Sequence, residues 1–109
     1  MSALNDTVAA IATPQNTGSI GIIRISGEDA ITIADRVFEP SGKKRLTALK
    51  GYRAAHGFAV SGGERIDECV ALVFRAPKSY TGENVVELSC HGGLFVLRRV
   101  LRAVFAAGA

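Results

Sequence analysis

Residues 20–26, with the sequence IGIIRIS, constrain the possible folds of this chain more than any other segment. The segment is rich in β-branched residues, and its apolar side chains fall on both faces of an extended chain. This pattern is typical of a strand inside a sheet, so we expect a central strand that is covered on each side. Arg24 is the one full charge in the segment. Burying it alone would be costly, and we therefore expect it to have a partner.

Alternating apolar patterns and turn residues divide much of the remaining chain into further predicted strands and the turns between them. Residues 61–64 (SGGE) predict the turn of a hairpin. The segments that read as strands, besides residues 20–26, are residues 6–13, 53–60, 65–74 and 85–88.

Two segments show helical spacing. The first follows Ser26, which with the acid Asp29 three residues later forms a capping-box pattern, and it ends before Pro40 and Gly42. The second covers residues 94–107, and its predicted inner stripe consists of Leu94, Leu97, Leu101 and Val104. The order strand-strand-helix-strand-strand-strand-helix predicts a single α+β domain over residues 1–109. We expect two layers, a mixed sheet of about five strands with helices packed on it.

Composition places the chain among ordinary globular proteins. Hydrophobic residues make up 48% and charged residues 21%, and the net charge of +3 permits an anionic partner without requiring one. No secretory signal or apolar run of membrane-spanning length is present, so we expect a cytoplasmic protein without a membrane partner. Cys69 and Cys90 lack the spacing of a metal motif and are expected to be free buried thiols rather than a disulfide.

Arg24 and Glu87 are the main candidates for binding a ligand. Each is the only charge in the middle of an otherwise apolar strand. One interpretation is a structural ion pair between them. The other is a ligand site, because a carboxylate can accept two parallel N–H bonds from the edge of a pterin or guanine, and a guanidinium can bind a planar anion or carbonyl.

His91, Gly92 and Gly93 stand at the predicted start of the second helix. The glycines would let an anion approach the backbone N–H groups there, although a simple turn with His91 on the surface explains them equally well. Tyr80 could stack on a flat ring or cover the edge of the core. No catalytic residue is predicted, because Cys90 and His91 point to opposite faces of a strand.

Several basic side chains could contact nucleic acid or could be plain solvated surface, and we identify no aromatic residues interleaved with them. They are Lys43, Lys44, Arg45, Arg98, Arg99 and Arg102. No phosphate-binding loop is present, since Ser41-Gly42-Lys43-Lys44 lacks both the leading glycine and the final hydroxyl of that motif.

The segments DTVAAIATP, GIIRISG and APKSYTGENVVELSCHGG occur in this order before a helix. Together they resemble the N-terminal domain of the MnmE (TrmE) family of tRNA-modification GTPases over essentially the whole chain. The resemblance implies a tetrahydrofolate-binding fold like that of aminomethyltransferases and a homodimer. It also implies that the complete protein has a helical domain and a G domain, absent from this chain, which binds GTP and Mg²⁺ and is activated by K⁺.

The same resemblance implies a biochemical role. With the FAD-dependent partner MnmG, the complete protein would modify carbon 5 of the wobble uridine of tRNA, using carbon from a one-carbon tetrahydrofolate (the 5-formyl or 5,10-methylene form). Arg24 and Glu87 match folate contacts of the family, and the turn at residues 91–93 would lie beside that pocket. The loop Gln15–Ser19 differs from the glycine- and arginine-rich turn usual in the family. The alternatives are a basic RNA-binding module and a purely structural dimerisation domain.

Overall fold

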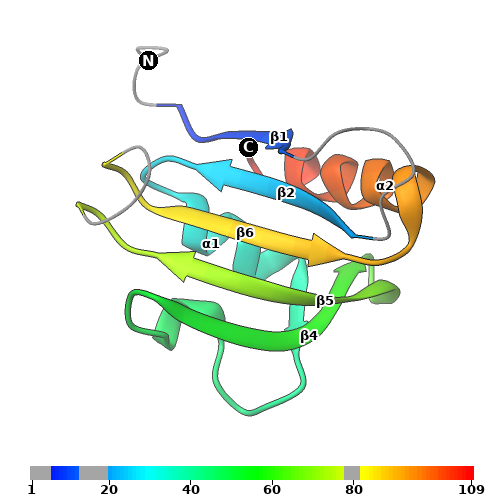
Figure 1. The fold of residues 1–109 in the computed structure, drawn as a ribbon, viewed down its shortest axis with the longest axis horizontal. Helices are drawn as coiled ribbons and strands as arrows, with labels where there is room; N and C mark the ends of the chain where they lie inside the picture. Colours follow the sequence, from blue (N-terminus) through cyan, green and yellow to red (C-terminus); the bar gives the residue numbers. More distant parts are fainter. Residues whose placement is uncertain (1–5, 13–19, 78–81) are drawn as a thin grey trace.

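In the part of the chain that the structure describes, six strands form a single sheet in the order β1-β2-β6-β5-β4-β3 (Figure 1). The computed structural model describes residues 6–12, 20–77 and 82–109. The strands are β1 (Val8–Ile11), β2 (Gly21–Ser26), β3 (Phe38–Pro40), β4 (Arg53–Ser61), β5 (Glu64–Phe74) and β6 (Val85–Cys90). The helices among these residues are α1 (Ala30–Arg36) and α2 (Gly93–Ala106), and the segment Leu46–Ala48 forms the short 3₁₀ turn η2.

The predicted α+β class with helices packed on a sheet is confirmed. The sheet has six strands rather than about five, because the segment Phe38–Pro40 forms β3 and pairs with β4. All pairings among the described strands are antiparallel, whereas the sequence analysis expected a mixed sheet. β3 lies at the edge of the sheet, a position where a strand tolerates proline.

Both helices cover the same face of the sheet and lie behind it in Figure 1. The core between the two layers is fully apolar, and its sheet side includes Ile23, Ile25, Ala71, Val73, Val86 and Leu88. α2 approaches β2 closely, since a Cβ atom on Gly21 would lie 2.6 Å from a methyl carbon of Leu97. The sheet face turned away from the helices, called the open face below, carries Ile22 and Arg24 of β2, both half-buried. β2 is therefore an inner strand that helices cover on one side only, not on both sides as its sequence suggested.

The start of α1 differs from the prediction. Ser26 is the last residue of β2, and its hydroxyl donates to Oε2 of Glu83 at 3.0 Å instead of capping the helix. The N-cap is Asp29, and its backbone N–H donates to Oγ1 of Thr7 at 3.1 Å. The predicted capping box is therefore wrong, because a threonine from the neighbouring chain segment supplies the acceptor.

α2 matches its predicted bounds within one residue, but its buried stripe is rotated. The residues that it buries are Leu97, Val100, Ala103 and Val104, whereas Leu94 and Leu101 are only partly buried. No helix among the described residues is long and apolar enough to cross a membrane.

Cys69 and Cys90 are free and buried, as predicted, and stand directly opposite each other on β5 and β6. A hydrogen bond with the Cys90 thiol, together with burial, raises the pKa of the Cys69 thiol far above its ordinary value. Cys69 is therefore a protonated and weakly reactive thiol in the folded protein.

Candidate functional site

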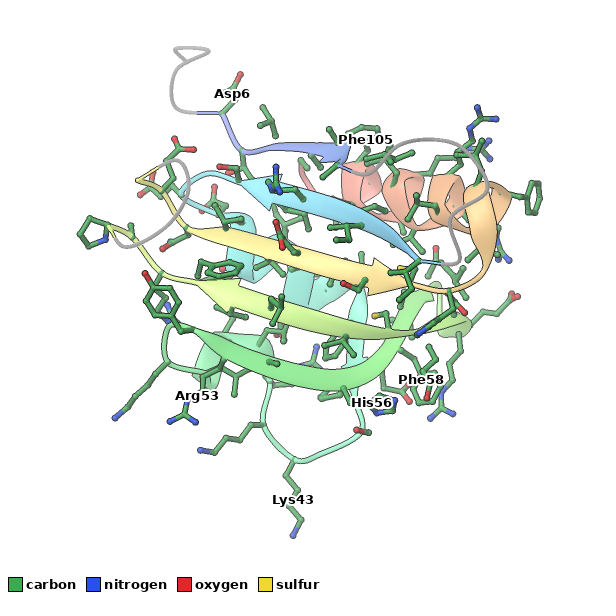
Figure 2. All side chains as sticks on the ribbon, viewed as in Figure 1. Asp6, Lys43, Arg53, His56, Phe58 and Phe105 are labelled. Atoms are coloured by element: carbon green, nitrogen blue, oxygen red, sulfur yellow. The ribbon has the colours of Figure 1, made fainter. Side chains whose placement is uncertain are left out.

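The open face is an apolar surface with one ion pair at its centre. The strand register places five residues in a row across it, from β1 to β4: Ala10, Arg24, Glu87, Leu72 and Ala54. The neighbouring row on one side is formed by Ser26, Val85 and Phe74, and on the other side by Ile22, Ser89 and Val70. Figure 2 shows the sheet from this face, with the helices behind it.

Arg24 and Glu87 form a close ion pair because β2 and β6 pair in a register that sets them directly opposite each other. Nη2 of Arg24 lies 2.8 Å from Oε2 of Glu87, and Nε donates to the same oxygen at 2.9 Å. Only 8% of the Glu87 side chain is exposed, against 41% for Arg24. The cross-strand pair that the sequence suggested as one interpretation is therefore present.

This arrangement can hold a flat ligand with a polar edge. The partly exposed apolar side chains of Leu72 and Ile22 lie near the carboxylate on the open face, so the body of a ring system can lie on them. Glu87 supplies a desolvated acceptor for N–H groups, and hydrogen bonds to charged groups are stronger than those between neutral groups. A ligand can reach the guanidinium of Arg24, which is partly exposed to solvent.

The predicted anion position at the start of α2 is taken by the chain itself. The backbone N–H groups of His91 and Gly92 both donate to Oδ2 of Asp67, at 2.7 and 3.0 Å. Sequence reasoning missed Asp67, and its only signal was an acid inside the β5 segment RIDEC. The carboxylate offsets the partial positive charge of the helix N-terminus, as a bound anion would.

The other predicted pocket residues are not joined to the ion pair by any contact that the described part of the chain shows. His91 directly follows the end of β6 and lies four residues after Glu87, a separation of about 13 Å in an extended chain. A role for His91, Gly92 and Gly93 in binding stays a prediction. Tyr80 lies outside the described residues. Among the residues that the structure does describe, no three His, Cys, Asp or Glu side chains are grouped so that they could hold a metal ion.

The basic side chains separate into paired and unpaired groups. Arg45 pairs with Asp35 at 3.1 Å, and Arg99 lies 3.7 Å from Glu64. The exposed residues Lys43, Lys44, Arg98 and Arg102 make no ion pair with any described residue. The sequence analysis found no aromatic residue among the basic ones, yet Tyr52, between Lys50 and Arg53, has 62% of its surface exposed.

The fold is thus that of a small α+β domain, with an ion pair between a nearly buried carboxylate and a partly exposed guanidinium at the centre of its open face. The family model described as "GTP-binding protein TrmE N-terminus" matches residues 7–109. The chain belongs to this TrmE N-terminal family, as its sequence motifs had indicated.

Curated relatives support the same assignment. The chain is 51% identical over 105 residues to a tRNA modification GTPase MnmE of Symbiobacterium thermophilum, covering 95% of this chain and 23% of the relative. It is 50% identical over 106 residues to the protein of that name from Roseiflexus castenholzii, covering 96% of this chain and 22% of the relative. For that of Thermus thermophilus the identity is 50% over 111 residues, covering 100% of this chain and 25% of the relative. The chain thus spans about a quarter of the length of these relatives.

Proposed function

We propose that this chain binds a one-carbon tetrahydrofolate on its open face and acts as the N-terminal, homodimer-forming domain of a cytoplasmic tRNA-modification GTPase. The observation that carries the proposal is the Arg24–Glu87 pair, a nearly buried carboxylate at the centre of an apolar sheet face. The family assignment and the names of the relatives support the wider role in tRNA modification.

The chemistry of the ligand fits the two charged groups. The pterin ring of a folate presents a 2-amino-pyrimidinone edge with adjacent N–H donors, which the carboxylate of Glu87 can accept as a pair. The guanidinium of Arg24 is suited to the ring carbonyl or to the carboxylates of the glutamate tail. The flat ring would then cover the partly exposed side chains of Leu72 and Ile22, removing apolar surface from water.

The remaining parts of the proposal concern the complete protein. GTP hydrolysis, Mg²⁺ and K⁺ would belong to a G domain outside this chain, and the FAD-dependent protein MnmG would be the partner in modifying the wobble uridine. The 5-formyl and 5,10-methylene folates are both compatible with the proposed site, because they differ at the one-carbon unit and share the pterin edge.

Folate binding can be tested by titrating 5-formyltetrahydrofolate into the purified chain and measuring heat. Glu87→Gln and Arg24→Met should each weaken binding by roughly 10- to 100-fold, because each removes charge-assisted hydrogen bonds worth about 1.5–3 kcal/mol. Arg65→Met is the matched control, since it removes an arginine whose ion pair with Glu39 is exposed. Unchanged affinity in both site variants would show that the site is wrongly assigned.

Light scattering over a range of concentrations tests dimerisation in the same samples. A dimer that binds no folate would favour the purely structural alternative, and a monomer at every concentration would contradict the dimerisation proposal for this chain.

A further inference from the structure

The positive charge of this chain is concentrated in one segment. Residues 41–63 contain five Lys or Arg and no Asp or Glu, out of thirteen basic and ten acidic residues in the chain. The rest of the chain contains eight basic and ten acidic residues, which gives it a formal charge of −2. The net charge of +3 therefore arises entirely from residues 41–63.

The fold brings these charges to one margin of the molecule, beyond β4. Lys43, Arg53 and His56 lie along this margin in Figure 2. Lys43 and Lys44 line a hollow of about 350 Å³ together with Leu49 and His56, so the turn after β3 faces the start of β4. This is room for a sugar or a phosphate group.

Acids near this margin already have partners. Asp35 pairs with Arg45, and Oε2 of Glu68 lies 2.7 Å from Nε2 of His56. Lys43, Lys44, Lys50 and Arg53 are exposed and form no ion pair with the residues that the structure describes. Their charges remain available to an anionic partner.

Tyr52 adds an aromatic ring to this surface. Its backbone has φ +59°, the only positive φ of a non-glycine residue in the described chain, which is uncommon for a bulky side chain. The backbone N–H donates to the Val73 carbonyl at 2.8 Å, and the ring packs edge-on against Phe74 at 5.9 Å. These contacts hold a ring that is 62% exposed between Lys50 and Arg53. Strained backbone of this kind is often kept where a side chain has a function.

We propose that this surface, which we call the basic margin (Lys43, Lys44, Lys50, Tyr52 and Arg53), binds single-stranded RNA. The cations would contact consecutive phosphates, and one unstacked base would lie on the Tyr52 ring. Stacking on an exposed aromatic between basic residues is the usual way of holding a single strand, whereas a duplex keeps its bases stacked inside. The choice of RNA over DNA rests on the proposed role in tRNA modification, while the folate site is not needed for it.

A second surface makes a natural comparison. On α2, the exposed residues Phe95, Arg98 and Arg102 also combine an aromatic ring with cations. There Arg99 already lies near Glu64, and the helix has no strained backbone that fixes the ring. The variants Lys50→Gln/Arg53→Gln and Arg98→Gln/Arg102→Gln remove the same charge from the two surfaces and can be compared directly.

The test is fluorescence anisotropy with a labelled single-stranded oligouridine of roughly a dozen nucleotides. Lys50→Gln/Arg53→Gln should weaken binding at least tenfold at low salt and reduce the slope of log K against log salt by about 1.4, since each phosphate contact on a single strand contributes about 0.7. Arg98→Gln/Arg102→Gln should leave both quantities within twofold of the parent. Equal or larger loss in the α2 variant, or no loss in the margin variant, would overturn the proposal.

The ring is tested separately. Tyr52→Asn keeps a residue that tolerates left-handed backbone but removes the ring, and it should lower affinity roughly 5- to 100-fold with an unchanged salt slope. Tyr52→Phe should bind like the parent. Unchanged binding by Tyr52→Asn, or tighter binding of an RNA duplex of equal length, would refute the single-strand mode. Titration of 5-formyltetrahydrofolate into the same variants should be unaffected, which separates this result from failure of the folate proposal.

Discussion

The unequal burial of Arg24 and Glu87 predicts an unequal response to their removal. In Arg24→Met the carboxylate of Glu87, with 8% of its side chain exposed, loses its partner in a desolvated place. In Glu87→Met the guanidinium of Arg24, with 41% exposed, can still be hydrated. Removing one partner of a fully buried pair costs about 3–5 kcal/mol. Water can enter the space that the Arg24 side chain leaves and partly hydrate Glu87, which lowers this cost. We therefore expect Arg24→Met to lower the free energy of unfolding by about 2–3 kcal/mol, and Glu87→Met by about 1 kcal/mol or less.

The double variant Arg24→Met/Glu87→Met completes the cycle. Replacing both charges on this apolar face should restore the free energy of unfolding to within about 1 kcal/mol of the parent, because no unpaired charge remains. The same variant should not bind folate, so stability and binding would be separated in one protein.

Urea unfolding at neutral pH, followed by circular dichroism, measures the four proteins, and their m values should agree. The midpoints of thermal unfolding should rank the variants in the same order as urea does. We expect the midpoint of Arg24→Met to be lower than that of the parent by about 10–20 °C, since 1 kcal/mol shifts the midpoint of a domain near this size by about 4–8 °C. The reasoning fails if Glu87→Met is the more damaging single change. It also fails if the double variant is as unstable as Arg24→Met.

Three further predictions follow from other contacts. Gly57→Ala should destabilise the fold by about 2–3 kcal/mol in urea, because its new Cβ would overlap a carbonyl oxygen of β3, whereas Gly42→Ala, with no atom within 4 Å, should change little. Cys69 and Cys90 should not react with Ellman's reagent at pH 8 until denaturant is added, since both are buried and the raised pKa of the Cys69 thiol disfavours its thiolate; fast reaction in native buffer would contradict this. Asp67→Asn should speed hydrogen exchange of the backbone amides of His91 and Gly92, just before α2, and cost about 1–2 kcal/mol, and unchanged exchange would show that the carboxylate is not their acceptor in solution.

The sequence allowed the pair at the centre of the site to be predicted, because a lone charge in each of two apolar strands leaves few partners. The structure confirms that Arg24 and Glu87 meet. That a folate binds to the pair stays a proposal, since Arg24 and Glu87 also satisfy each other's charge without any ligand. The free, buried state of Cys69 and Cys90 was likewise predictable from their spacing.

What could not be predicted depends on contacts between distant segments. Ser26 and Asp29 formed a valid capping pattern, but the hydroxyl of Thr7, the residue before β1, accepts from the start of α1. The three residues of β3 are too few for a periodic pattern, and Pro40 is equally typical of a helix end. No signal in the sequence indicated that Tyr52 is exposed, because tyrosine is intermediate between the residues that are most often buried and those that are mostly exposed.

The order of the strands also governs when the candidate site can form. β4 and β5 are joined by a short turn, whereas Arg24 and Glu87 are 63 residues apart in the chain. Closing so long a loop is entropically costly and slow compared with forming a hairpin. On a ribosome, β2 must therefore wait for its partner β6 to emerge, and the open face would be among the last parts of the domain to be assembled.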